Sequence, residues 1–253
     1  MPTTFDLAFL TSSELAQRQD ARIALQPIGA TEQHGANLAL GTDSLAAEAI
    51  ARRLAERLAP RAVVLPTLPY GISEHHMGFP GTLTLGPETV LALLRDVARS
   101  LHRQGFRMLM FINGHNGNTS ILNVASAAIR YELDLPTAAM FYFKQAADVV
   151  KECGKTDRYG HACEIETSVM LYLDERCVRK AELEPGDMIP SERAFADNSN
   201  PYALYAPIPF ADQTRNGVFG DARFANREVG ERIIETALDR TVAFVNGFLA
   251  NAS

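Results

Sequence analysis

Residues 22–58 read RIALQPIGATEQHGANLALGTDSLAAEAIARRLAERL. The first eight residues form an apolar run with the length of a buried β-strand. The last fifteen carry one apolar stripe, from Leu45 to Leu58, as in an amphipathic helix that Asp43 or Ser44 could cap. The polar segment between them has few large apolar side chains that folding could bury. We therefore expect a strand, a polar loop and a helix.

The same alternation continues along the chain and predicts the fold class. Strand, helix and strand in succession favour an α/β fold with a mainly parallel sheet and helices on both faces. Nothing resembles a linker, so we expect a single domain over residues 1–253. A segment rich in Pro, Gly, Asn and Asp, 184–222, is expected to be a long irregular excursion near a site. Further apolar runs lie at 62–68, 107–114 and 136–143, and helical patterns at 87–105, 119–133, 164–177 and 227–249.

Composition excludes several classes of protein. The net charge of −6 and the pI near 5.5 argue against nonspecific binding to nucleic acid. No apolar run approaches the roughly 18–20 residues that a membrane span needs, and the N-terminus lacks the pattern of a signal peptide. The cysteines Cys153, Cys163 and Cys177 have no CxxC spacing, so neither a disulfide framework nor a zinc ribbon is indicated. We expect a cytoplasmic protein with a small-molecule substrate.

Polar motifs follow two of the expected strands. Ligands of open parallel sheets gather beyond the carboxyl ends of the strands. GATEQHGANLALGTD (29–43) and FINGHNGN (111–118) lie there, so His115 should come close to Glu32, His34 and Asp43. These four side chains are a mixed carboxylate–imidazole set suited to Zn, Mn or Fe. The alternative is a solvated charged loop beside a Gly/Asn-rich turn with an exposed histidine.

A third motif, HACEIETS (161–168), places His161, Glu164 and Glu166 at the start of a helix. Carboxylates in a first helical turn also interact favourably with the helix dipole, so either glutamate alone is open to that simpler explanation. The phosphate-binding patterns GxGxxG and GxxxxGK[ST] are both absent, which argues against a nucleotide-phosphate loop.

Five blocks follow one another along the chain: PIGATEQHGANLALGTD, GISEHHMGFPGTLTL, FINGHNGN, GHACEIETS and NGVFGDARFA. Together they resemble the creatininase (creatinine amidohydrolase) family, in the family's order, from about residue 22 to 240. The resemblance implies a three-layer α/β sandwich, a dinuclear metal centre and hydrolysis of C–N bonds. It also implies a homo-oligomer, with a hexamer possible.

Carried over by motif, the family's ligands for two divalent ions fall on Glu32, His34, Asp43 and His115, with Asp43 as the bridging carboxylate. This chain departs from creatininase proper at Gly117, where the family has a ligating glutamate two residues after the NGH histidine. Two adjacent cations need about as many carboxylates as fit, so a third is expected. The ET motif makes Glu166 the candidate, with Glu164 in reserve.

The resemblance also assigns roles around the reaction. His161 matches the family's catalytic histidine, and its pKa range suits protonation of a leaving amine. Glu166 is counted with it among the catalytic residues. The predicted substrate-binding residues are Glu74, His76, Asn113 and Asn116.

The substrate is less well defined by the sequence. The absence of tryptophan, together with Gly117, argues against creatinine itself. We expect hydrolysis of a small cyclic amide or formamide by a water activated between two metal ions. A peptide-cleaving or ring-opening C–C hydrolase of the same family, a mononuclear metal lyase or isomerase, and a nonenzymatic scaffold subunit are the alternatives. Arg193, Arg215 and Arg223 could bind a phosphorylated substrate.

Overall fold

Four parallel β-strands form the centre of the computed structural model, which describes residues 5–190 and 207–250. Their order across the sheet is β2-β1-β3-β4, and every neighbouring pair is parallel. Each strand lies inside one of the apolar runs predicted from the sequence. The strands are β1 (Ile23–Ile28), β2 (Ala62–Val64), β3 (Met108–Asn113) and β4 (Thr137–Phe141).

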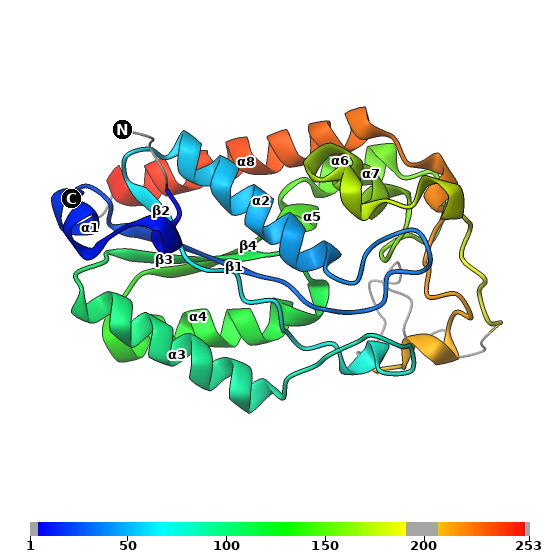
Figure 1. Ribbon diagram of the computed structural model, residues 1–253, viewed down its shortest axis with the longest axis horizontal. Coiled ribbons are helices and arrows are strands. Elements are labelled where there is room, and N and C mark those ends of the chain that lie inside the picture. The colour runs from blue at the N-terminus through cyan, green and yellow to red at the C-terminus, as the bar shows by residue number, and fades with distance from the viewer. Residues whose placement is uncertain (1–4, 191–206, 251–253) are drawn as a thin grey trace.

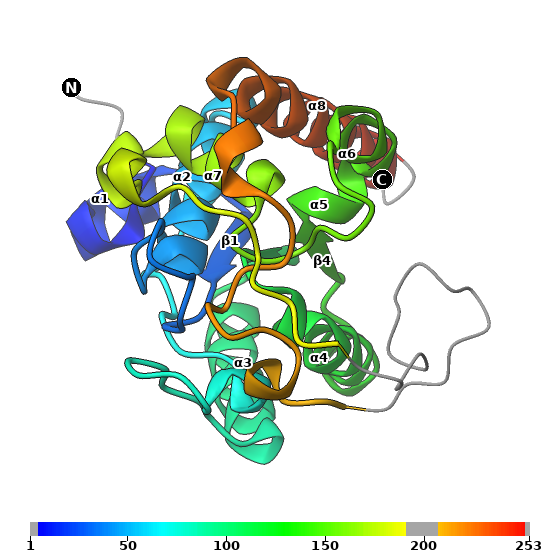
Figure 2. The ribbon, with the colours of Figure 1, turned by 90° about the vertical axis from the view of Figure 1, so that its right-hand side faces the viewer.

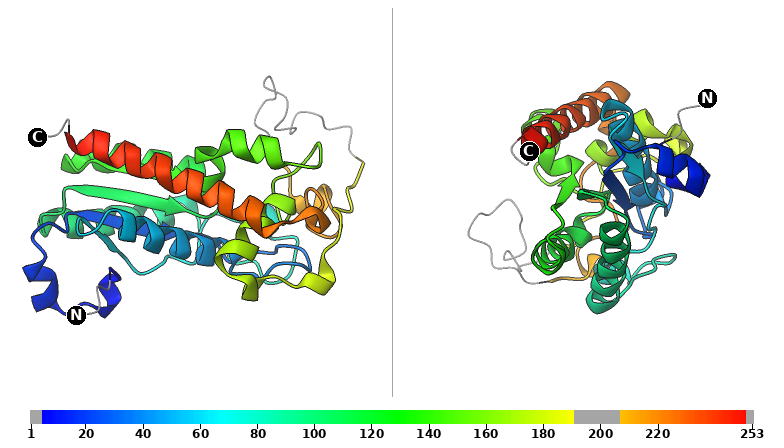
Figure 3. Two further views of the ribbon diagram at one scale, coloured as in Figure 1. Left: turned by 90° about the horizontal axis from the view of Figure 1, so that it is seen from above. Right: turned by 90° about the vertical axis from the view of Figure 1, so that its left-hand side faces the viewer.

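Helices cover both faces of the sheet (Figure 1). Alternate side chains of β3 enter opposite layers: Met108 and Met110 pack on one side, Leu109 and Phe111 on the other. α8 runs beside α2 on the first of these faces (Figure 3). The first face carries α2 (Thr42–Arg57), α5 (Tyr142–Gln145), α6 (Ala147–Cys153), α7 (Glu164–Leu173) and α8 (Arg227–Ala250); the second carries α3 (Pro87–Arg103) and α4 (Thr119–Leu133).

The three-layer α/β sandwich is thus confirmed. The remaining helices are short and lie in the connections. They are η1 (Leu7–Phe9), α1 (Ser12–Gln17), η2 (Glu74–His76), η3 (Asn116–Asn118), η4 (Glu175–Cys177), η5 (Lys180–Glu182), η7 (Phe210–Asp212) and η8 (Ala222–Phe224). No helix in the described ranges is long and apolar enough to cross a membrane.

The apolar stripe of α2 differs from the predicted one at its start. Leu45 is 37% exposed, because the inward positions of the first turn belong to Asp43 and Ser44. The Ser44 hydroxyl donates to the carbonyl of Ala30 at 2.9 Å, which fixes that turn against the loop after β1. The buried face of the helix continues through Ala47, Ile50, Leu54 and Leu58.

The loops that follow the strands gather at one end of the sandwich, where Figure 2 looks onto them. The described parts of the excursion 184–222 fold back on each other there, through bridges such as Met188 to Thr214. Arg215 and Arg223 form ion pairs with nearby aspartates. Carboxylates therefore already balance the charges of both guanidinium groups. Arg193 lies outside the described residues.

Candidate metal centre

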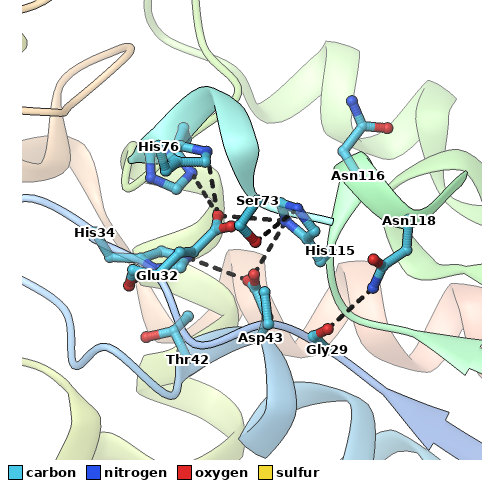
Figure 4. Close-up of polar contacts among 12 residues, drawn as sticks. Gly29, Glu32, His34, Thr42, Asp43, Ser73, His76, His115, Asn116 and Asn118 are labelled. Atoms are coloured by element: carbon cyan, nitrogen blue, oxygen red, sulfur yellow. Dashed lines mark hydrogen bonds and ion pairs between the residues drawn. The ribbon is translucent and has the colours of Figure 1, made fainter. Parts of the chain in front are cut away.

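The four predicted ligands come together at the loop end of the sheet (Figure 4). Glu32 and His34 lie after β1, Asp43 lies in the first turn of α2, and His115 follows β3. His115 Nδ1 is 3.2 Å from Asp43 Oδ2 and 3.3 Å from Glu32 Oε1, while His34 Nε2 is 3.1 Å from Asp43 Oδ1. All four side chains are buried.

A glycine explains how the first turn of α2 reaches the loop after β3. A Cβ placed on Gly114 would lie 2.0 Å from the backbone oxygen of Asp43. Any side chain at this position would therefore push the two segments apart. The missing side chain lets Asp43 lie beside His115, although 72 residues separate them in the sequence.

Two ligand sets meet at Asp43. In the first set, Asp43 Oδ2 lies with Glu32 and His115. In the second, Asp43 Oδ1 faces His34, which lies with His161 and Glu166. Glu166 Oε2 is 3.7 Å from His34 Nε2 and 3.9 Å from His161 Nδ1. One carboxylate with an oxygen toward each set is what a bridging ligand requires.

The three imidazoles of these sets share one hydrogen-bond arrangement. Each places one ring nitrogen against a backbone carbonyl, which can only accept, so that nitrogen carries the hydrogen. In the neutral ring, which is the form that ligates a metal ion, the other nitrogen has a lone pair and faces the carboxylates. The pairs are His34 Nδ1 with Glu32 O (3.1 Å), His115 Nε2 with Ile72 O (3.0 Å) and His161 Nε2 with Gln33 O (2.7 Å).

The donor set fits a pair of cations. Both carboxylate oxygens of Glu32 and Oδ2 of Asp43 are buried without a hydrogen-bond partner. Buried charged oxygens that face imidazole lone pairs are costly unless positive charge lies between them. Divalent ions would supply that charge, and carboxylate oxygen with imidazole nitrogen suits Zn, Mn or Fe.

Charges in the site strongly perturb one another. Burial opposes a positive charge on His34, but Asp43 and the other carboxylates outweigh it and raise the pKa of His34 to about 10. Burial raises the pKa of Glu166 to about 7. Burial, followed by the nearby His34, lowers the pKa of His161 to about 3, which favours the neutral ring. Perturbed groups of this kind concentrate at functional sites.

The two glutamates of the ET motif have different surroundings. The Glu164 carboxylate accepts hydrogen bonds from the backbone N–H groups of Lys155, Thr156 and Asp221 and from the Thr156 hydroxyl. It therefore holds two loops together. Glu166 accepts one backbone bond, from Ala162, and its carboxylate lies among the ligands.

Gly117 has no room for a side chain. A Cβ there would lie 2.2 Å from His115 Nε2 and 2.4 Å from the Ile72 carbonyl, the two atoms of the hydrogen bond that orients His115. A glutamate at this position would break that bond. The third carboxylate near the imidazoles is that of Glu166.

We expect Gly117→Ala to weaken metal binding by about 10- to 100-fold, the usual effect of losing a bond that orients a metal ligand. Its Cβ must displace either the His115 ring or the backbone at Ile72. Metal titration of the purified variant measures the change. Gly247→Ala, in α8 with open space around the added Cβ, is the matched control and should bind metal like the wild type.

The four predicted substrate-binding residues have different positions. His76 is buried, with Nε2 3.2 Å from Glu32 Oε1. Asn113 is buried too, but its side-chain oxygen accepts from the His115 N–H and so supports the loop. The structure does not bring Glu74 or Asn116 into the cluster. Both side chains are exposed, and Asn116 points away in Figure 4.

Two side chains of the site, Asn118 and Phe210, are not among the predicted site residues. Asn118 joins two loops, since it donates to the Gly29 carbonyl and accepts from the Ile72 N–H. The ring of Phe210 covers the imidazoles of His76 and His161, with centroids 4.1 and 5.0 Å apart. The only signal for Asn118 was its place in NGHNGN, and Phe210 has none, because it lies in the irregular excursion.

The fold and the site are those of an α/β protein with a carboxylate–imidazole centre at the loop end of a parallel sheet. Comparison with known proteins then identifies the family. The family model for creatininase, creatinine amidohydrolase, matches residues 8–245. The chain belongs to the creatininase family, and it is a hydrolase.

Relatives within the family have different substrates. The mycofactocin precursor peptide peptidase of Mycolicibacterium smegmatis is 35% identical over 216 residues, which cover 83% of this chain and 79% of the relative. The creatinine amidohydrolase of Pseudomonas putida is 30% identical over 235 residues, which cover 85% of each chain. A crystal structure of creatinine amidohydrolase superposes with a TM-score of 0.79, at 28% identity, over 97% of this chain and 98% of the other.

Proposed function

We propose that this protein is a metal-dependent hydrolase that cleaves an amide C–N bond with two divalent ions per chain. The observation that carries the proposal is the pair of ligand sets that share Asp43, with His34 Nε2 3.1 Å from one oxygen of its carboxylate and His115 Nδ1 3.2 Å from the other. Zinc, manganese and iron all suit these donors. Solved creatininases described as a zinc–zinc type and a manganese form support the first two.

Bound ions would supply a hydroxide from water near neutral pH and would polarise the carbonyl of the substrate. The chain's own residues perform the remaining steps. Glu32, Asp43 and Glu166 hold the negative charge that keeps the ions in place. His161 is left for proton transfer, since His34, Asp43 and Glu166 would hold the second ion. Its Nδ1, unprotonated in the neutral ring and 3.8 Å from Glu32 Oε1, can take a proton from the attacking water and give it to the departing amine. Phe210 covers this histidine and excludes water.

The finer proposal is a small cyclic amide or a formamide as substrate. A peptide bond is the second candidate, because the peptidase of Mycolicibacterium smegmatis is more similar to this chain than the creatinine amidohydrolase of Pseudomonas putida is. Both reactions break an amide C–N bond, so the same site serves either one. The shared carboxylate argues against a mononuclear lyase or isomerase. A homo-oligomer, with a hexamer possible, and a cytoplasmic location stay predictions of the sequence.

Metal analysis followed by a substrate panel tests the proposal. We expect two divalent ions per chain and chelator-sensitive hydrolysis of an amide in a panel of cyclic amides, formamides and short peptides. One ion per chain with lyase or isomerase activity would favour the mononuclear alternative. A protein that binds no metal and hydrolyses nothing would refute the proposal and favour a scaffold subunit.

Phe210→Ala is expected to lower kcat/KM about tenfold, because an aromatic contact is worth about 0.5–1.5 kcal/mol and the ring also keeps water from the imidazoles. Phe210→Leu should retain most of the activity, since it still covers His76 and His161. Steady-state kinetics on the best amide of the panel measure both. Phe9→Ala, which removes an exposed phenylalanine of η1, should leave kcat/KM unchanged.

A further inference from the structure

A third group of ligand-type atoms lies beside the two sets that share Asp43. It consists of Glu32, His76 and His161, whose ligand atoms are buried and within 4.8 Å of one another. By distance alone, this group suits a cation as well as the other two do. The hydrogen bonds of His76 distinguish it.

His76 faces a side-chain donor where the other imidazoles face a carbonyl. Gln33 Nε2 lies 2.9 Å from His76 Nδ1. The amide orientation of Gln33 is fixed, because the Gly35 N–H donates to its Oε1 at 3.0 Å and its Nε2 donates to the Gly217 carbonyl at 3.3 Å. His76 Nδ1 must therefore accept, and the hydrogen of the neutral ring lies on Nε2.

The hydrogen on His76 Nε2 closes the third group to a cation. That nitrogen lies 3.2 Å from Glu32 Oε1, so a ring nitrogen bearing a hydrogen faces the carboxylate. A ring nitrogen that carries a hydrogen has no lone pair for a metal ion. Glu32 Oε1 also lies 3.3 Å from His115 Nδ1 and 3.8 Å from His161 Nδ1.

Gln33 has little freedom to turn. Its side chain is buried, and a Cβ on Gly217 would lie 2.0 Å from its Oε1, so only glycine fits against it. The backbone carbonyl of Gln33 also accepts from His161 Nε2 at 2.7 Å. The 3.1 Å contact between Gln33 Nε2 and His161 Nε2 then joins two donors and is no hydrogen bond. One residue thus sets the hydrogen position on two imidazoles.

We propose that Gln33 is a positioning residue that keeps the ring hydrogen of His76 on Nε2, the nitrogen that faces Glu32, and so limits the centre to two cations. The limit on cations rests on the proposed function. The hydrogen position on His76 does not, because it follows from hydrogen bonds within the chain alone.

The first test is ¹⁵N NMR of the histidine side chains in the metal-free protein, assigned with a His76→Gln variant. We expect the wild type to show His76 protonated at Nε2. In Gln33→Glu the carboxylate can only accept, so the hydrogen should move to Nδ1. Gln104→Glu, at an exposed glutamine after α3, makes the same charge change and should leave the His76 signals unchanged.

Zinc titration is the second measurement. Wild type and Gln104→Glu should bind two zinc ions per chain, while Gln33→Glu should bind a third. Excess zinc should inhibit Gln33→Glu at a concentration about tenfold lower than the one that inhibits the wild type. Gln33→Met, which removes the donor without adding charge, should also admit the third ion and covers the case in which Gln33→Glu does not fold.

The two measurements separate the two proposals. Wild-type His76 protonated at Nδ1, or unchanged signals and zinc count in the Gln33 variants, would overturn the role of Gln33. The expected NMR signals in a wild-type protein that binds no zinc would instead overturn the proposed function and leave the hydrogen position established.

Discussion

Asp43→Ala is expected to remove both metal ions and to reduce hydrolysis to background. Asp43 directs Oδ1 toward His34 and Oδ2 toward His115, so its loss takes a ligand from each set at once. Metal ions stabilise the transition state by several kcal/mol, and about 5 kcal/mol corresponds to a fall of more than a thousandfold. Elemental analysis of the purified variant, with activity on the best amide substrate, measures both effects.

The variant should still fold. The first turn of α2 is held by the Ser44 hydroxyl bond to Ala30 and by the close approach of Gly114, and neither involves the Asp43 side chain. Circular dichroism should therefore match the wild type. Asp96→Ala, which removes an exposed carboxylate of α3, is the control and should keep both ions. One ion retained at full occupancy in Asp43→Ala would show that Asp43 serves only one set.

The fold was largely predictable because buried parallel strands leave a continuous apolar signal. Residues 107–114 became β3, Met108–Asn113, and residues 119–133 became α4 without change. The stripe of α2 was mispredicted at Leu45, since counting apolar positions cannot show that two polar side chains turn inward in the first turn. The meeting of the motifs at 29–43 and 111–118 was predictable, because parallel strands end at the same edge.

What the sequence left undetermined depends on contacts between distant segments. The side chain of Gln33 donates to the Gly217 carbonyl and that of Asn118 to the Gly29 carbonyl, and no local sequence pattern predicts either contact. The side chains of short helices were also unpredictable: in η2 the exposed Glu74 lies two residues from the buried His76. Only the hydrogen-bond partners in the structure show which of two such neighbours belongs to the site. The same holds for the two glutamates of the ET motif.

Glu166→Gln is expected to lose the ion of the second set. The activation free energy should rise by roughly 4 kcal/mol, which lowers kcat about a thousandfold. Glutamine keeps the shape and can still accept from the Ala162 N–H, but it brings an amide in place of a charged oxygen beside His34 and His161. Two divalent ions carry four positive charges, and the change leaves two of three carboxylates to balance them. Metal content per chain and kcat measure the result.

Glu164→Gln is the matched control, two residues away in the same helical turn. The Glu164 carboxylate accepts four hydrogen bonds from Lys155, Thr156 and Asp221 and does not face the ligands. A glutamine there turns an amide toward some of those donors, so the variant should unfold more easily, by about 1–3 kcal/mol, while it keeps both ions. Thermal melts and metal analysis separate the two effects. Loss of an ion in Glu164→Gln but not in Glu166→Gln would make Glu164 the third carboxylate ligand. Unchanged metal content in both variants would contradict the argument from charge balance, because two carboxylates alone would then hold the ions.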